Sequence, residues 1–326
     1  MSRNRVRLAT GAVVSALLLG APPASALAEV PAPGTVQVRH DRQAGPVGHH
    51  VGAPRLIPLE GAVNFRDVGG YRTYGGGAVR HGLVYRADGL GRLTDPDLLT
   101  LKGLRLGKVI DYRVPVEVQY DGRDRLPPGL AVTERPVNDS GLYGQMMAAI
   151  ATADPVRQEA ALGGGKGAAL MRSVYRTLIS DPANTAQFAA TFRDIARGSS
   201  RSAVLFHCTS GKDRSGWTSY VLLRALGVPE RTARADYLAS NTIRAAADAK
   251  VREGLRQAGL MQHPELLIPL QEVRDDYLDT ALAEVTARYG SLHSYLKRGL
   301  GLDLRTLAKL QTQLVGRPGP ASHVTP

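Results

Sequence analysis

Cys208 is the single cysteine of the chain, and it stands in a segment whose residues could carry out a reaction. The segment reads Leu-Phe-His-Cys-Thr-Ser-Gly-Lys-Asp-Arg-Ser-Gly-Trp, from Leu205 to Trp217. An apolar run, which predicts a strand, leads into the cysteine, and an amphipathic stretch beginning at Arg214 and Ser215 predicts a helix. Five residues therefore separate the cysteine from the arginine, between a strand and a helix.

This spacing can build a cup for an oxyanion. Backbone N–H groups of a short loop can converge on one point, and the helix N-terminus adds its unpaired N–H groups. The residues predicted to bind phosphate are Thr209, Ser210, Gly211, Lys212, Asp213 and Arg214. The planar guanidinium of Arg214 fits two phosphate oxygens, and the positive cup favours a thiolate at Cys208 over a thiol. The thiolate could then attack phosphorus in line, and Ser215 could help the sulfur to leave in a second step. A buried structural cysteine is the alternative, which the polar loop disfavours.

The elements that must position this loop alternate between short apolar strands and helices. The predicted strands are Leu83–Arg86, Lys108–Tyr112, Ala131–Val137 and Ser202–Phe206. The predicted helices include Asn184–Ala196, Ser215–Leu226, Glu230–Ala239, Thr242–Ala258, Glu272–Tyr289 and Leu304–Val315. This order predicts an α/β fold, in which helices flank a central sheet and the C-terminal half is mostly helical.

The loop resembles the signature of the cysteine-dependent protein tyrosine phosphatases, and its Gly-Lys-Asp-Arg form resembles their atypical bacterial branch of secreted tyrosine and lipid phosphatases. The further segments that resemble this branch, over about residues 57–315, are Asn64–Tyr71, Asp236–Asn241 and Tyr289–Leu302. Ser215 stands where the family more often has threonine, and Tyr112 where it usually has leucine; neither change removes a reacting group. The resemblance implies hydrolysis of phosphate monoesters through a cysteinyl-phosphate, without a metal or an organic cofactor.

The general acid has several candidates. A leaving phenolate or alkoxide needs a proton, so a carboxyl group should stand near the cup. Asp213 lies in the loop itself, and the resemblance implies that this position supplies the acid; its carboxylate could instead only orient a neighbouring cation. Asp139 and Asp111 are the alternatives, although Asp111 and Glu117 are also interpreted as partners that hold arginines in place.

Lys212 and Arg66 bear on the choice of substrate. A second cation at the rim suits a substrate with more than one phosphate, and the resemblance implies activity on phosphotyrosine and on phosphoinositides. Phosphoserine and phosphothreonine are further expected substrates. Alternatively, Lys212 pairs with Asp213 or Asp67 and only positions the loop. Arg66 is predicted to contact the substrate, with a buried, purely structural Asn64–Asp67 turn as the alternative.

Residues 140–170 look like an insertion, with three consecutive glycines at 163–165. The resemblance implies a helical lid over the site, in which Met146, Met147 and Ile150 cover its apolar mouth. An exposed, mobile loop is the alternative.

The ends of the chain read differently from its middle. Three arginines in the first seven residues, an apolar run over Leu8–Gly20 and small-residue cleavage sites predict a secretory signal peptide over residues 1–28, hence secretion. An uncleaved anchor is the alternative. Residues 29–56 predict a flexible linker, residues 57–315 the phosphatase domain, and residues 316–326 a tail.

Charge and composition limit the remaining functions. The 326 residues carry a formal net charge of +12, which favours phosphorylated partners and peripheral contact with anionic membranes. No specific nucleic-acid partner is predicted, because no motif accompanies the charge. A single cysteine excludes an intramolecular disulfide and a cysteine-rich zinc site. The alternative to the enzyme is a non-catalytic binder of phosphoproteins or anionic lipids, which the intact Cys208, Arg214 and Ser215 disfavour.

Overall fold

The computed structural model describes residues 53–199 and 201–316. The predicted signal peptide, residues 29–52 of the predicted linker and residues 317–326 of the predicted tail lie outside these described residues. No helix in the described part of the chain is long and apolar enough to cross a membrane.

Within the described residues, six strands form the main sheet in the order β1-β2-β4-β7-β5-β6. These strands are β1 (Arg55–Leu56), β2 (Arg66–Asp67), β4 (Val84–Ala87), β5 (Leu106–Asp111), β6 (Val132–Glu134) and β7 (Ala203–His207). The last four strands of that order are parallel, and β1 and β2 extend the sheet antiparallel at one edge. All five residues of β7 are buried, as expected for an apolar strand inside a sheet covered on both faces.

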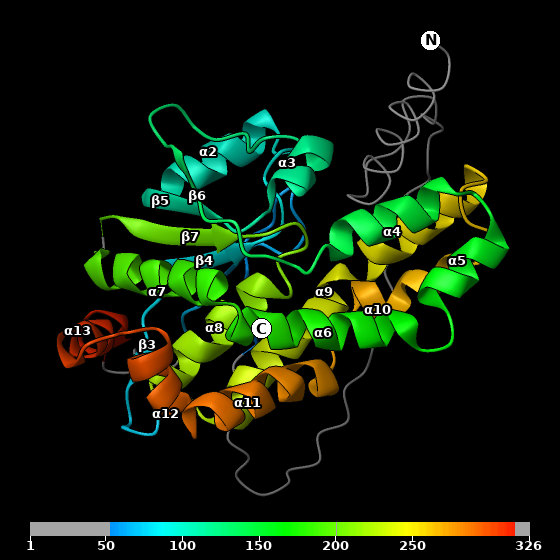
Figure 1. Ribbon diagram of the computed structural model, residues 1–326. Coiled ribbons are helices and arrows are strands. Elements are labelled where there is room, and N and C mark those ends of the chain that lie inside the picture. The colour runs from blue at the N-terminus through cyan, green and yellow to red at the C-terminus, as the bar shows by residue number, and fades with distance from the viewer. Residues whose placement is uncertain (1–52, 200, 317–326) are drawn as a thin grey trace, which may run out of the picture.

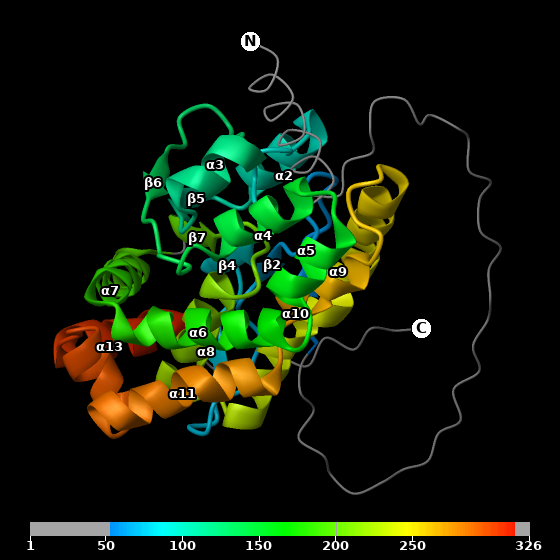
Figure 2. The ribbon, with the colours of Figure 1, turned by 45° about the vertical axis from the view of Figure 1, so that its right-hand side comes forward.

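Side chains alternate between the two faces along each strand, so an apolar strand presents apolar side chains on both faces of the sheet. Helices cover both of these faces. In β7, Ala203 and Leu205 join a smaller core beneath α2 (Asp95–Gly103), while Val204 and Phe206 join the main core beneath α7 (Pro182–Arg197) and α8 (Arg214–Ala225). Figures 1 and 2 show α2 and α3 on one side of the sheet and α7 and α8 on the other. The α/β prediction is confirmed.

The remaining elements are mostly helices in the C-terminal half of the chain. They are β3 (Ala78–Val79), α3 (Pro115–Asp121), α4 (Leu142–Ala151), α5 (Pro155–Leu162), α6 (Lys166–Ser180), α9 (Glu230–Gln257), η1 (Pro264–Leu267), α10 (Ile268–Gln271), α11 (Asp275–Tyr289), α12 (Leu292–Ser294), η2 (Tyr295–Gly299), α13 (Leu304–Leu314) and β8 (Val315–Gly316). Each predicted strand is present with its ends moved by one to three residues.

One predicted break in the helices is wrong. Two helices were expected on either side of Ser240 and Asn241, but α9 runs through both residues. Such side chains weaken helices when they compete for nearby backbone groups. Here they bind other elements: Asn241 exchanges two hydrogen bonds with the main chain of Val273 (2.7 and 2.8 Å), and Ser240 accepts one from Arg66 (3.2 Å).

The segment 140–170 is not an exposed loop. It contains α4, α5 and the start of α6. The side chain of Gln158, fully buried on α5, donates to the carbonyl of Leu260 at 2.7 Å and joins the segment to the turn that follows α9. Met147 and Ile150, expected at the mouth of the site, instead pack in the main core.

Strand residues also lie just outside the predicted phosphatase domain at both ends. Arg55 and Leu56, assigned to the linker, form β1 at the edge of the sheet. Gly316, assigned to the tail, forms β8 with Val315 and pairs with β3.

Candidate active site

The loop 208–213 lies at the carboxyl end of β7, between that strand and α8. Gly211 has a φ of 64°, and a Cβ there would lie 2.4 Å from the carbonyl oxygen of Ala87 in the neighbouring β4. Any larger residue would therefore force the loop away from the sheet. Glycine at this position allows the loop to close tightly over the strand ends.

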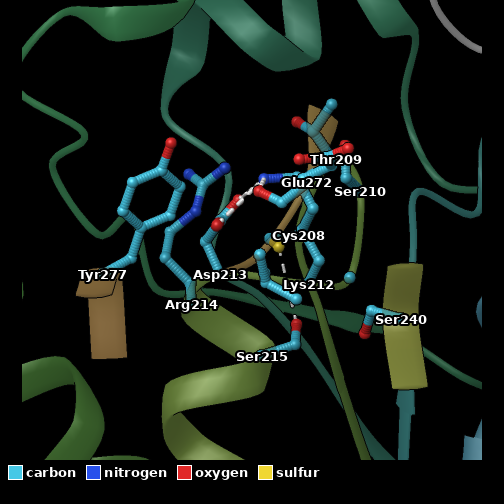
Figure 3. Close-up of polar contacts among 12 residues, drawn as sticks. Cys208, Thr209, Ser210, Lys212, Asp213, Arg214, Ser215, Ser240, Glu272 and Tyr277 are labelled. Carbon is cyan, nitrogen blue, oxygen red and sulfur yellow. Dashed lines mark hydrogen bonds and ion pairs between the residues drawn. The ribbon is translucent and has the colours of Figure 1, made fainter. Parts of the chain in front are cut away.

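Cys208 lies beneath the loop with its side chain 1% exposed. The hydroxyl of Ser215 donates to the cysteine sulfur at 3.6 Å, from the first turn of α8 (Figure 3). The pocket beside the loop is lined by Thr209, Ser210 and residues 212–214, and Cys208 itself is not among the residues that line it. The structure thus brings the predicted nucleophile and its serine together.

Arg214 is held by Glu117, the first acidic residue of α3. Its two terminal nitrogens each donate to one carboxylate oxygen of Glu117, with 2.6 Å for the Nη1–Oε2 bond, and Thr209 donates to the same carboxylate at 2.6 Å. Burial opposes charge on both groups, but their attraction outweighs it: the pKa of Glu117 falls below its usual range and that of Arg214 rises well above its own. The predicted role of Glu117 as an arginine partner is confirmed.

Lys212 turns toward Asp213 (Figure 3). Its Nζ lies 2.9 and 2.7 Å from the two carboxylate oxygens of Asp213 and 3.3 Å from the main-chain carbonyl of Glu272. The lysine is 2% exposed, yet it lines the pocket together with Asp213. The ion pair agrees with the interpretation that Lys212 pairs with Asp213 and positions the loop. Because Lys212 also lines the pocket, it is placed where it could contact a substrate.

The three acid candidates lie in different surroundings. Asp213 and Asp139 both line the pocket. Asp139 accepts hydrogen bonds from the backbone N–H groups of Gly141 and Tyr143, each at 2.9 Å, and so begins α4. Asp111 does not line this pocket and is bound by Arg113 instead.

His207 belongs to a buried ion-pair network behind the nucleophile. Its Nε2 lies 2.8 Å from Asp124, and its Nδ1 lies 3.8 Å from Asp111. Burial lowers the pKa of His207, but the two carboxylates outweigh burial and the net shift is upward. Ligand atoms of the three residues lie within 4.8 Å of one another, close enough for a metal ion. Arg113 contacts both carboxylates and supplies the positive charge that such an ion would bring.

Arg66 does not contact the pocket, which contradicts the predicted substrate contact. The side chain is fully buried and donates to Asp236, Asn64 and Ser240. Asn64 in turn donates to the carbonyl of Ser210 at 2.9 Å. The N-terminal motif therefore supports the loop from below.

Arg86 is a supporting residue that the sequence patterns did not identify. It donates to the carbonyl of Gly211 at 2.7 Å and pairs with Asp236 at 3.0 Å. Burial, followed by repulsion from Arg66, lowers its pKa to about 10, so it stays charged near neutral pH. The available signal was an arginine at the end of an otherwise apolar strand, since such a buried charge needs a partner.

Arg244, on α9, is a second such residue. It lies 3.2 Å from Asp88, pairs with Asp248 at 2.7 Å and donates to the carbonyl of Ser210 at 3.4 Å. With Arg86 and Asn64, it donates to loop carbonyls from the protein side. A loop whose carbonyls are held in this way can direct its N–H groups to the opposite side, where an oxyanion would bind.

The wall of the pocket facing the loop is apolar. It is formed by residues of α4, α6 and α10, namely Leu142, Tyr143, Met146, Met171, Val174 and Leu270. Met146 was expected at this mouth and lies there. A polar loop opposite an apolar wall can receive a phosphate at one end and an apolar or aromatic group at the other.

Known proteins match the chain over this whole region. A family described as the tyrosine phosphatase family matches residues 57–316. A Cupriavidus necator protein named as a tyrosine-protein phosphatase is 31% identical over 286 residues, which cover 86% of this chain and 91% of that protein. The triple specificity protein phosphatase PtpB of Mycobacterium tuberculosis is 29% identical over 280 residues, covering 79% of this chain and 98% of that protein.

Proposed function

The chain belongs to the tyrosine phosphatase family, and from that premise we propose that it hydrolyses phosphate monoesters in two steps with Cys208 as the nucleophile. One observation carries this mechanism: Cys208 lies under a loop whose Arg214 is locked by Glu117 and whose Ser215 reaches the sulfur. In the first step the S–P bond forms while the bond from phosphorus to the leaving oxygen breaks. In the second step water attacks phosphorus, and the thiolate leaves with a hydrogen bond from Ser215.

Asp213 is proposed as the general acid and then the general base. It lines the pocket, whereas Asp139 is engaged at the start of α4 and Asp111 lies outside the pocket. In the first step its proton goes to the leaving oxygen, and in the second it takes a proton from the attacking water. Asp213→Asn should therefore slow poor leaving groups most. An unchanged rate on a phosphoserine peptide would reject this role.

Phosphotyrosine is the proposed main substrate, since its ring can lie against the apolar wall while its phosphate enters the loop. A relative named for triple specificity supports a wider range that includes phosphoserine and phosphothreonine. Phosphoinositides are proposed on account of Lys212, which lines the pocket and could pair with a second phosphate. A panel of these substrates at equal concentration tests the range, and Lys212→Met should selectively weaken turnover of the phosphoinositides.

Turnover of p-nitrophenyl phosphate by the wild type and by Cys208→Ser tests the mechanism. We expect turnover only in the wild type, together with a phosphorylated protein that is trapped by rapid acid quenching and maps to Cys208. A non-catalytic binder would instead bind phosphotyrosine peptide without any turnover. Equal rates in the two proteins would remove Cys208 from the mechanism.

Secretion is proposed from the order of basic, apolar and small residues over positions 1–28. The full chain, expressed in a bacterium, should appear outside the cytoplasm with its new N-terminus near residue 29. Retention of the intact chain in the cell would contradict this proposal.

A further inference from the structure

Tyr175 contacts the same carboxylate that we propose as the general acid. It projects from α6, is fully buried, and its hydroxyl donates to Oδ1 of Asp213 at 2.9 Å. Lys212 donates to Oδ1 at 2.9 Å and to Oδ2 at 2.7 Å. Oδ1 therefore has two donors, and Oδ2 has one.

A second tyrosine sets the direction of this hydrogen bond. The hydroxyl of Tyr237, on α9, lies 2.8 Å from the hydroxyl oxygen of Tyr175 and 3.3 Å from the main-chain carbonyl of Arg274, so the shorter contact is the one in which it donates to Tyr175. A phenol carries one hydrogen, so Tyr175, which accepts from Tyr237, can direct its own hydrogen to Asp213. Burial, and then the negative charge of Asp213, raises the pKa of Tyr175 well above its ordinary value, so Tyr175 remains a donor. The chain Tyr237–Tyr175–Asp213 links three helices at one carboxylate.

We propose that Tyr175 is a positioning residue that makes Oδ2 of Asp213 the oxygen that carries the catalytic proton. This inference rests on the proposed role of Asp213. A carboxylate oxygen offers about two lone pairs. Tyr175 and Lys212 fill both on Oδ1, whereas Oδ2 keeps one free. The proton held at Oδ2 passes to the leaving oxygen as the P–O bond breaks, and Oδ2 later receives the proton of the attacking water.

Without the Tyr175 hydroxyl, the carboxyl group could turn, so that either oxygen carried the proton. Lys212 alone cannot prevent this, because its ammonium contacts both oxygens at similar distances. The loss should then fall on proton transfer and not on phosphate binding. Substrates whose leaving groups need no proton should be nearly unaffected.

Tyr277 provides a matched control. Its ring lies 5.8 Å from the ring of Tyr175, it is equally buried, and its hydroxyl donates to the carbonyl of Pro269 at 3.0 Å. Tyr277→Phe therefore removes a comparable hydrogen bond from the same core region. No hydrogen bond joins Tyr277 to Asp213 among the described contacts.

The test measures kcat/KM, which reports on the steps up to cleavage of the P–O bond, for aryl phosphates from 2,4-dinitrophenyl phosphate to phenyl phosphate. The proteins compared are the full-length wild type, Tyr175→Phe, Tyr277→Phe and Asp213→Asn. For Tyr175→Phe we expect kcat/KM to fall about tenfold on phenyl phosphate and less than about twofold on the dinitrophenyl ester, a fraction of what a general acid supplies. Tyr277→Phe should show no dependence on the leaving group. Inhibition by inorganic phosphate should be unchanged in both tyrosine variants.

A double variant shows whether Tyr175 acts through Asp213. Adding Tyr175→Phe to Asp213→Asn should cause no further loss on phenyl phosphate. A uniform loss in Tyr175→Phe, equal on all esters, or a full further loss in the double variant would overturn the inference.

If Asp213→Asn itself shows no leaving-group dependence, the proposed acid is wrong and the inference falls with it. Should Tyr175→Phe not fold, Tyr237→Phe, which removes the donor to Tyr175, should show the same leaving-group dependence with a smaller loss.

Discussion

The floor and the wall of the pocket are built from opposite kinds of residue. The floor comprises the charged groups beneath and beside the loop, and its arginines are Arg66, Arg86, Arg214 and Arg244. The wall comprises the apolar side chains of α4, α6 and α10 that line the pocket. Every floor arginine is paired with a carboxylate, whereas the wall consists mostly of apolar side chains, whose contacts have no preferred direction.

The difference shows how one small site can be rigid toward phosphate and tolerant toward the rest of a substrate. A buried charge is costly unless it is paired, so each arginine is held in a defined geometry. Arg86 and Arg244 also donate directly to loop carbonyls. Apolar contacts depend mainly on area, so the wall can accept groups of different shape. Changes in the floor should therefore have larger effects than changes in the wall.

The largest expected effect is on stability, from Arg66→Met. The change leaves Asp236 with one guanidinium partner in place of two, and breaking a buried pair typically costs about 3–5 kcal/mol. The free energy of unfolding in urea measures it. The control Arg55→Met breaks a pair with a 60% exposed arginine and should cost less than about 1 kcal/mol. A large rise in KM with unchanged stability would restore Arg66 as a substrate contact.

Glu117→Gln should lower kcat/KM about 100-fold, comparable to the loss of one oriented donor in an oxyanion site. The glutamine cannot accept two hydrogen bonds from Arg214 and one from Thr209, so the guanidinium loses its fixed orientation. Steady-state kinetics on p-nitrophenyl phosphate measure the effect. Glu272→Gln, at a half-exposed carboxylate that does not line the pocket, is the control. A loss below about threefold would show that Arg214 is positioned without Glu117.

Asp121 joins the two regions, because it ends α3 and accepts a hydrogen bond from Tyr143 of the wall at 2.6 Å. Burial raises its pKa from 3.8 to about 6. The folded protein therefore holds this proton to higher pH than the unfolded chain. The protonated Asp121 carboxyl therefore contributes to the free energy of unfolding. This contribution is complete below pH 3.8 and is lost as the pH rises through about 6.

Asp121→Asn should remove this loss, which is on the order of 2 kcal/mol. The measurement is the difference in unfolding free energy between wild type and variant at pH 4 and pH 7. Asp95→Asn, at an exposed carboxylate, is the control. Parallel curves for wild type and Asp121→Asn would show that Asp121 ionises equally in both states.

The smallest expected effect lies in the wall. Met146→Ala should raise KM for aryl phosphates about fivefold through lost apolar contact, without changing inhibition by inorganic phosphate. The adjacent Met147 is a contrasting control: it is 6% exposed in the main core, so Met147→Ala should lower stability by about 2–4 kcal/mol and leave KM unchanged. Equal changes in KM would mean that the wall extends deeper than the described pocket.

The elements that the sequence predicted correctly depend on residues close together in the chain. The apolar run before Cys208 and the amphipathic run after Arg214 form β7 and α8, and the loop lies between them. The error at Ser240 and Asn241 has a matching cause. These residues disfavour a helix only when their side chains turn back on their own backbone, and partners from distant segments prevent that here.

The amino-acid sequence alone predicts the strand, the loop and the helix that bring Cys208, Arg214 and Ser215 together. These three residues lie within seven positions of one another, so local structure is enough to place them. Only the tertiary structure decided which groups hold them. Glu117 lies 97 positions from Arg214, and Tyr175 lies 38 positions from Asp213. A buried charge in the sequence shows that a partner is needed, but the packing of strands and helices around the loop selects which carboxylate, hydroxyl or carbonyl fills that need.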